Sequence, residues 1–293
     1  MLNVNQLPML SGTTEQSIVR IQTGPPQPRT DVLAVEEPLE IQLAFGKGAA
    51  RSRRSLAVTM RTPGHDFDLV MGFLFTEGII GSAQDVLQMR FAGEQLDETT
   101  RENVILVDLH PALDFDFNRL NRHFYTASSC GVCGKASIEM VQTTCSFLLP
   151  KASPRISPEL LFSLPQKLHG QQTLFSQTGG IHAAALFDAS GNLQWLREDV
   201  GRHNALDKLI GAALKQGQIP LQHSMVLVSG RASFELVQKA LMAGVPVLAA
   251  VGAASSLAAE LAEAHGMTLV GFLRAASANV YCGYERIDSL RNR

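Results

Sequence analysis

The chain has few cysteines, little charge and no long basic run, and each shortage excludes a class of protein. Four cysteines in 293 residues cannot build a disulfide framework, and this usage is typical of a reducing compartment. Charged residues make up 18% of the chain and the net charge is −2. Binding to nucleic acid depends on clustered lysine and arginine, so we do not expect it. The short basic cluster at 51–54 is explained by a solvated hairpin turn.

Sequences that direct a chain to or across a membrane are also missing. No stretch reaches the roughly 18 uninterrupted apolar residues of a membrane span. The most apolar region, 245–264, is interrupted by a proline, a glycine and two glutamates. Residues 1–30 lack the charged and apolar regions of a signal peptide and contain a proline-rich run, so we expect a flexible N-terminal lead-in there. These features predict a soluble cytoplasmic protein.

A glycine-flanked pair of cysteines is the most reactive feature that is present. Cys130 and Cys133 are three positions apart, and each is followed by glycine, which permits tight turns and leaves the sulfurs unshielded. A helix expected over 135–141 would lower the thiol pKa through its N-terminus. The pair fits a sulfur carrier, a dithiol redox pair, half of a zinc site or a buried structural pair. Cys145 and Cys282 look like ordinary buried thiols.

The first half of the chain predicts a small α+β module over 31–125. Alternating apolar residues indicate two strands between 32 and 60, joined by a glycine-containing loop. Apolar residues at helical intervals indicate a helix over 66–80, and 104–109 is a further strand. The cysteine loop and its helix then occupy 126–150.

The second half, 151–293, predicts an α/β domain in which strands and helices alternate. After a linker over 150–158, a helix begins at Ser157 and runs to about His169. Strands are expected at 182–187, 193–196, 225–229, 245–251 and 268–272, and helices at 204–215, 233–243 and 255–265. The β-α-β-α-β order implies a parallel sheet covered by helices, with right-handed crossovers.

Three loops follow the parallel strands, at the sheet edge where ligands bind in such folds. The loops 229–233, 252–255 and 272–277 are rich in small residues and hydroxyls, and Arg231 and Arg274 lie in two of them. Helix N-termini and arginine suit a phosphate group, although serine at these positions is also explained by helix capping. Three such loops on one edge favour a phosphate-bearing ligand. Neither a Walker A nor a G-x-G-x-x-G pattern is present.

Two further features have an ordinary and a functional interpretation. The segment 198–204 places two carboxylates, an arginine and a histidine at a strand-to-helix junction. Either Asp199 or Asn204 caps the helix while Arg202 pairs with Glu198, or the Arg202-His203 pair lies near the ligand or the sulfurs. His182 is either a satisfied core group or a residue of the ligand edge.

These motifs closely resemble those of the FdhD family, the sulfurtransferase-type accessory proteins of formate dehydrogenase. The resemblance extends from about residue 36 to 281. It rests on several long motifs in a fixed order, which lie at 71–80, 130–134, 178–185, 198–208, 229–233 and 269–272.

The resemblance implies a fold and a reaction. The fold class is α/β, with a cytidine-deaminase-like three-layer α/β/α core and a smaller α+β N-terminal module. Proteins of this kind accept sulfur from a cysteine desulfurase as a persulfide, and that position falls on Cys130, with Cys133 as its partner. They pass the sulfur to the molybdenum cofactor, bis-molybdopterin guanine dinucleotide, before its insertion into the catalytic subunit of formate dehydrogenase.

The resemblance also implies a cofactor-binding stretch and an assembly. The stretch falls on Phe272, Leu273, Arg274, Ala275, Ala276 and Ser277, and we add Ser229, Arg231 and His182 from the same edge. The sequence departs from the family where Ala276 and Ser277 replace the usual glycine and arginine, so Arg274 and Arg231 are expected to supply the charge. A guanine nucleotide is expected to mimic the cofactor. A homodimer is expected because related proteins of this fold associate, and no resident metal is expected.

Three other functions compete with sulfur transfer. A zinc-dependent deaminase requires H-x-E followed by P-C-x-x-C, but here Ala184 stands at the glutamate position and the cysteines precede His182. A thioredoxin-type oxidoreductase requires its cysteine motif near the start of a βαβ unit, and the motif in this chain lies far from such a position. A non-catalytic chaperone of the cofactor or the apo-dehydrogenase stays open.

Overall fold

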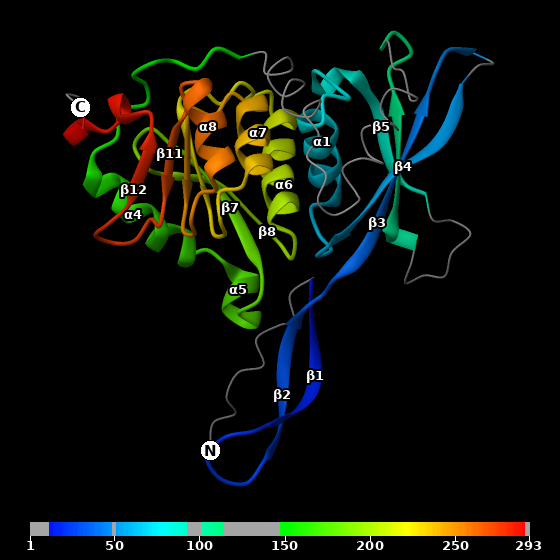
Figure 1. Ribbon diagram of the computed structural model, residues 1–293. Coiled ribbons are helices and arrows are strands. Elements are labelled where there is room, and N and C mark those ends of the chain that lie inside the picture. Colours follow the sequence, from blue (N-terminus) through cyan, green and yellow to red (C-terminus); the bar gives the residue numbers. More distant parts are fainter. Residues whose placement is uncertain (1–11, 49–50, 93–100, 114–146, 291–293) are drawn as a thin grey trace.

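The computed structural model describes residues 12–48, 51–92, 101–113 and 147–290, and its larger part is a six-stranded sheet (Figure 1). The strand order is β12-β11-β10-β9-β7-β8. The bounds are β7 His182–Asp188, β8 Leu193–Asp199, β9 Ser224–Val228, β10 Val247–Ala250, β11 Thr268–Gly271 and β12 Asn279–Cys282. Strands β9, β10 and β11 are parallel, whereas β7, β8 and β12 join antiparallel. The expected parallel run is confirmed, and β12 is an addition to it.

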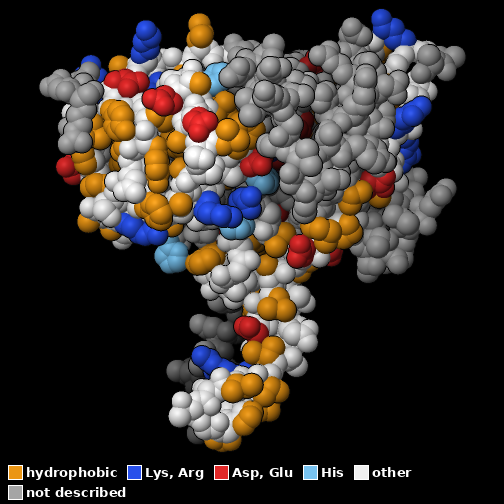
Figure 2. All heavy atoms as spheres, in the orientation of Figure 1, with side chains coloured by type: hydrophobic (Ala, Val, Ile, Leu, Met, Phe, Trp, Pro, Cys, Tyr) orange, Lys and Arg blue, Asp and Glu red, His pale blue; other side chains and the backbone are white. Residues whose placement is uncertain are grey.

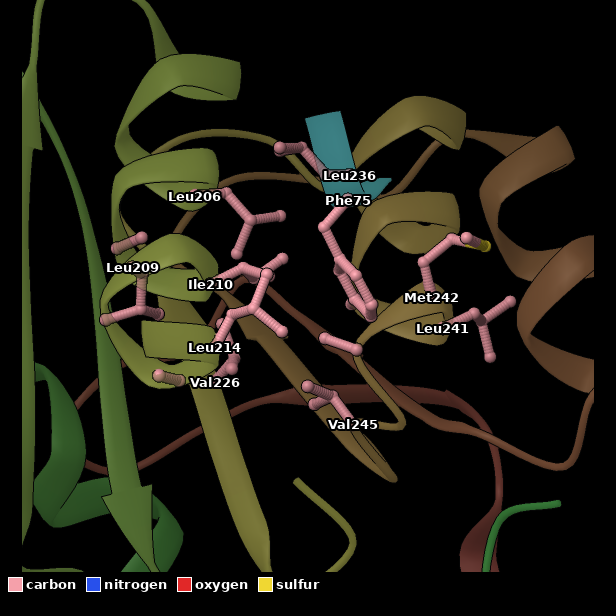
Figure 3. Packing of buried hydrophobic residues seen from close by; sticks show 14 of the residues in the cluster. Phe75, Leu206, Leu209, Ile210, Leu214, Val226, Leu236, Leu241, Met242 and Val245 are labelled. Carbon is pink, nitrogen blue, oxygen red and sulfur yellow. The ribbon is translucent and has the colours of Figure 1, made fainter. Parts of the chain in front are cut away.

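Helices cover both faces of this sheet. Helices α6 Arg202–Lys215, α7 Phe234–Met242 and α8 Ser256–Ala264 lie on one face, and α4 Pro158–His169 lies on the other. Successive strand residues point to opposite faces, so Val226 packs with α6 and α7 while Met225 and Leu227 pack with α4. Figure 3 shows part of the hydrophobic cluster between the sheet and helices α6 and α7. The predicted α/β class is confirmed, and Ser157 caps α4 by accepting the N–H of Leu160 at 3.2 Å.

The N-terminal part is a four-stranded sheet with helix α1 Asp66–Thr76 on one face. The strand order is β4-β3-β6-β5, with bounds β3 Glu37–Phe45, β4 Ser52–Arg61, β5 Val86–Phe91 and β6 Val104–Leu109. The two expected strands, the helix and the strand at 104–109 are confirmed, and β5 is an addition. Short 3₁₀ turns η2 Ala83–Asp85, η3 Arg101–Asn103, η4 Tyr284–Arg286 and η5 Asp288–Leu290 complete the described elements.

Helix α1 crosses α6 so closely that glycine is required on both helices. A Cβ atom at Gly72 would lie 1.8 Å from the carbonyl oxygen of Asp207, and one at Gly211 would lie 1.9 Å from that of Asp68. Phe75 of α1 consequently reaches the cluster formed by α6 and α7, as Figure 3 shows. The two sheets therefore share one hydrophobic core through α1.

A buried ion pair reinforces this junction. The Nζ atom of Lys208 lies 2.7 Å from Oδ2 of Asp199, and both side chains are almost fully buried. Lys208 also donates to the carbonyl oxygen of Thr62 at 2.8 Å, and Asp199 accepts the N–H of Thr62 at 3.2 Å. The C-terminal part thus binds the residue that directly follows β4.

A two-stranded hairpin protrudes from the body of the molecule (Figures 1 and 2). It consists of β1 Thr13–Arg20 and β2 Gln27–Ala34, paired antiparallel, and the short helix α5 Thr173–Thr178 packs near β2. We expected a flexible lead-in over residues 1–30, and the structure differs from residue 13 onwards. The β-branched residues of β1 pair with β2 across a turn at Gly24, so the proline-rich run lies at a hairpin turn.

Among the described residues, none of the helices combines the length and the apolar character that crossing a membrane requires.

Candidate functional site

The predicted sulfur loop lies outside the described residues. Cys130, Cys133 and Cys145 all fall within 114–146, so their roles and the helix at 135–141 stay predictions. The fourth cysteine, Cys282, is 3% exposed and donates to the carbonyl oxygen of Met267 at 3.2 Å. Burial raises the pKa of its thiol to about 11, so it holds its proton at neutral pH and is a poor nucleophile. The expectation of a buried thiol is confirmed for Cys282.

The three loops predicted to form the ligand edge contact one another directly. The N–H of Gly252 donates to the carbonyl oxygen of Gly230 at 2.8 Å, and the N–H of Ala232 donates to that of Ala253 at 2.9 Å. The N–H of Phe272 donates to the carbonyl oxygen of Gly252 at 2.8 Å. A Cβ at Gly252 would lie 2.8 Å from the Gly230 oxygen, which explains the glycine at this point. The structure therefore joins the loops into one continuous edge.

Several of the predicted binding residues have structural partners within this edge. The Ser229 hydroxyl accepts the N–H of Ala183 at 2.9 Å, and the Leu273 side chain is fully buried beneath the sheet. The Arg274 guanidinium donates to the carbonyl oxygens of Val251 at 2.6 Å and of Leu273 at 2.9 Å. Ser255 caps α8, as the ordinary interpretation proposed. Ser229 and Leu273 therefore shape the edge, whereas Arg274 is exposed and both of its described hydrogen bonds come from Nη1.

The remaining predicted residues of the edge are accessible. Phe272 is 45% exposed and has a φ of 51°, a left-handed conformation that is strained for a bulky residue. Its ring is held outside the core although the neighbouring Leu273 is buried. The other exposed residues of this group are Arg231, Ala275, Ala276 and Ser277. An exposed aromatic ring and an exposed arginine at one edge can hold a base and a phosphate.

His182 lies at the start of β7, beside this edge. Its Nδ1 atom is 3.4 Å from the position that a Cβ would take at Gly230, and Cδ of Arg202 is 3.9 Å from the same position. Burial and the nearby Arg202 charge lower its pKa, so the ring is neutral at pH 7. The structure brings His182 to the predicted ligand edge and places it only partly in the core.

The carboxylates of the 198–204 segment are engaged away from Arg202. Glu198 accepts the N–H groups of Leu174 and Phe175 at the start of α5, both at 2.9 Å. Asp199 accepts the N–H of Gly201 at 2.8 Å in addition to its ion pair with Lys208. Helix α6 begins after Gly201 without a side-chain cap. The proposed pair between Arg202 and Glu198 is therefore not formed.

His203 links the start of α6 to the start of α7. Its Nε2 atom lies 3.5 Å from the Ser233 hydroxyl, which precedes α7, and 3.9 Å from the Glu235 carboxylate. Burial and then the adjacent Arg202 charge lower the pKa of His203 to about 4. A neutral imidazole at this place can share a hydrogen bond with Ser233 without adding charge.

Replacing His203 by glutamine is expected to flatten the loss of stability in acid. The unfolded chain binds a proton on this histidine near pH 6.5, whereas the folded chain binds it only near pH 4. Between these values the unfolded state binds more protons, so stability falls as the pH falls. Urea unfolding at pH 7, 6, 5 and 4 measures this difference. His223→Gln, which changes an exposed histidine, should lose stability with falling pH as the wild type does. If the stability of His203→Gln falls with pH as steeply as that of the wild type, the prediction is contradicted.

Sequence reasoning missed a second buried ionic cluster behind the edge. Lys239 of α7 lies 3.0 Å from both Asp207 and Glu77, and its Nζ atom donates to Thr76 at 2.9 Å. Burial raises the pKa of Asp207 to about 6, whereas the two carboxylates raise the pKa of Lys239. A lysine in an apolar helix pattern was the available signal. In the described parts of the chain, no group of three His, Cys, Asp or Glu residues could hold a metal.

Comparison with known proteins gives a consistent result. The model of the FdhD/NarQ family matches residues 34–288. A protein named sulfur carrier protein FdhD from Streptomyces avermitilis is 51% identical over 277 residues, which cover 94% of this chain and 95% of that protein. A protein of the same name from Sulfurisphaera tokodaii is 42% identical over 257 residues, covering 88% and 92%.

A solved structure agrees with these relatives. A crystal structure from Desulfotalea psychrophila, described as a candidate formate dehydrogenase accessory protein, has a TM-score of 0.70 and 26% identity. The match covers 94% of this chain and 99% of that chain, so it includes both sheets.

Proposed function

Because the chain belongs to the FdhD/NarQ family, we propose that it is a sulfur carrier that serves the maturation of a formate dehydrogenase. The observation that carries this proposal is the 51% identity, over almost the whole of both chains, to a protein named as a sulfur carrier. The likeness to a structure described as a candidate formate dehydrogenase accessory protein supports the second part. The cytidine-deaminase-like layering of the core and the cytoplasmic location stay predictions.

In the proposed reaction, Cys130 receives one sulfur atom from a cysteine desulfurase. The Cys130 thiolate attacks the outer sulfur of the donor persulfide, a new S–S bond forms on Cys130, and the donor leaves as a thiolate. The number of S–S bonds is unchanged, so this step requires neither an oxidant nor a reductant. Cys130 is the candidate acceptor because the resemblance of its motif to the family implies a persulfide at this position, and because burial raises the pKa of Cys282.

Release of the sulfur as hydrosulfide requires two electrons, which Cys130 and Cys133 can supply together by forming a disulfide. The Cys133 thiolate attacks the inner sulfur of the Cys130 persulfide, so that a Cys130–Cys133 disulfide forms and hydrosulfide leaves. A thiol reductant then restores both cysteines. Hydrosulfide is a soft ligand, which suits a transition metal as its acceptor. We propose that this acceptor is the molybdenum of the bis-molybdopterin guanine dinucleotide cofactor. This cofactor is a substrate of the proposed reaction.

The edge formed by the three loops fits the nucleotide ends of such a substrate. Helices α7 and α8 begin directly behind the loops, and N–H groups of a first helical turn can donate to an anion, although Ser255 already accepts the N–H of Ala258 in α8. Arg231 is exposed beside them, and Phe272 offers a ring on which a base can stack. These features support a ligand with phosphate and an aromatic base. The cysteine desulfurase, the dehydrogenase catalytic subunit and a second copy of this chain are the proposed partners.

Intact-protein mass spectrometry after incubation with a cysteine desulfurase and cysteine tests the sulfur step. We expect a reducible gain of one sulfur, about 32 Da, on the wild type and none on Cys130→Ala. Cys282→Ala serves as the matched control and should retain the gain. Normal dehydrogenase maturation by Cys130→Ala, without a mass gain on either protein, would instead favour a non-catalytic chaperone.

A further inference from the structure

Arg202, the first residue of α6, has no ion partner among the described residues. The nearby carboxylates of Glu198 and Asp199 are held by the α5 N-terminus and by Lys208. Glu235 is within electrostatic range but 56% exposed, and its carboxylate lies 3.9 Å from the neutral His203 ring. The Nε–H of Arg202 is buried and has no hydrogen-bond partner among the described residues. A buried donor without a partner is rare and calls for an explanation.

The position of Arg202 on its helix makes the missing partner more unusual. An α-helix carries a partial positive charge at its N-terminus, where aspartate and glutamate are preferred. Helix α6 has 14 residues, no side-chain cap and no acidic residue in its first turn. Arg202 therefore adds a positive charge to a positive helix end, which destabilises the chain when no anion is bound.

The surroundings of Arg202 converge on the ligand edge. Its Cδ atom and the His182 ring both lie within 4 Å of the position that a Cβ would take at Gly230. Gly230 belongs to the loop that leads into α7, and His203 connects the starts of α6 and α7 through Ser233. Two helix N-termini thus meet beside the Gly230 loop, together with a guanidinium that has no ion partner among the described residues.

We infer that Arg202 binds a phosphate group of the ligand, at a subsite between the N-termini of α6 and α7. A guanidinium can donate two parallel hydrogen bonds to phosphate oxygens, and the N–H groups of the first turn of α6, which has no side-chain cap, can complete such a site. The inference deepens the proposed function and rests on it in one respect, because the nucleotide end of the substrate is taken as the source of the phosphate.

Calorimetric titration of the full chain with guanosine diphosphate, guanosine and inorganic pyrophosphate tests the subsite. Arg202→Gln should bind guanosine diphosphate and pyrophosphate at least about tenfold more weakly than the wild type, because a charged hydrogen-bonding partner is lost. Its affinity for guanosine should be unchanged. Arg202→Lys keeps the charge without the planar fork and should be intermediate. Arg155→Gln, which removes an exposed arginine elsewhere, is the matched control and should bind like the wild type.

Thermal unfolding without ligand separates a binding role from a structural one. Arg202 adds positive charge to a positive helix end and has no ion partner among the described residues, so Arg202→Gln should leave the Tm unchanged or raise it by about 1–3 °C. If Arg202→Gln does not fold, Arg202→Lys decides the test, and an affinity of this variant equal to that of the wild type would overturn the inference.

Three other outcomes are decisive. Wild-type affinity for guanosine diphosphate and pyrophosphate in Arg202→Gln would overturn the subsite, and so would a wild type that binds neither. Pyrophosphate binding that depends on Arg202, without binding of guanosine diphosphate, would support the subsite and count against the nucleotide part of the proposed function. If Arg202→Gln loses the mass gain on Cys130 but still binds guanosine diphosphate like the wild type, Arg202 acts in the sulfur step and the phosphate role is overturned.

Discussion

Replacing Gly72 or Gly211 by alanine is expected to destabilise the protein by about 3 kcal/mol or more. The added Cβ would lie 1.8 Å from the Asp207 oxygen in the first case and 1.9 Å from the Asp68 oxygen in the second. The obstructing atoms are backbone atoms of the facing helix, so no rotamer change can relieve the contact. Helices α1 and α6 must separate, and the shared core on both sides opens. Urea unfolding of each variant measures the loss, and the Tm should fall by roughly 6 °C or more.

Gly81→Ala is the matched control for this pair. The nearest atom to its added Cβ is a carboxylate oxygen of Asp85 at 3.7 Å, which is an ordinary contact. This variant should unfold within about 0.5 kcal/mol of the wild type, as surface changes usually do. A Gly72→Ala protein as stable as Gly81→Ala would show that α1 and α6 do not cross as closely as described.

Replacing Lys208 by methionine is expected to cost about 3–5 kcal/mol, because it leaves a buried carboxylate without its cation. Asp199 has no exposed surface and lies 2.7 Å from the lysine Nζ atom. Burial lowers the pKa of Lys208 while the Asp199 charge opposes this effect, so the attraction between the two charges offsets the cost of desolvating them. The variant also removes the donors to the carbonyl oxygens of Thr62 and Glu198. Urea unfolding at pH 7 gives the change in free energy.

Lys215→Met on the same helix is the control for Lys208→Met. Lys215 also forms an ion pair, at 2.8 Å from Asp68, but it is 40% exposed and Asp68 keeps Arg197 as a second partner at 2.9 Å. Its loss should cost less than about 1 kcal/mol. Equal costs for the two lysine variants would contradict the assigned role of the buried pair. Since Asp199 also holds the N–H of Gly201, this pair orients the start of α6, from which Arg202 projects.

Much of the fold could be predicted because each buried strand or helix has its own characteristic spacing of apolar residues. Strands β9 and β10 consist almost entirely of apolar residues, and helix α7 between them repeats apolar residues at helical spacing. Strand β5 was missed because its residues are partly or fully exposed and its pattern is mixed. The β1–β2 hairpin was missed because it buries almost no side chains, so backbone pairing forms it rather than an apolar pattern.

The candidate site divides in the same way. The loops 229–233, 252–255 and 272–277 could be assigned to one edge because parallel strands end together. The role of each side chain could not be assigned, since it depends on contacts between distant residues. Ser229 holds β7, Leu273 is buried, and Glu198 binds α5, whereas Arg202 is left without an ion partner among the described residues.

The sequence by itself determined the α/β class, the parallel run of strands, the FdhD resemblance and the cysteine pair, because these depend on local patterns and on the order of motifs. Only the tertiary structure decided that Gly72 and Gly211 bring two helices into backbone contact, and that Asp199 pairs with Lys208 whereas Arg202 pairs with none of the described carboxylates. The physical reason is that packing and charge pairing depend on which distant residues meet. A local pattern does not contain that information.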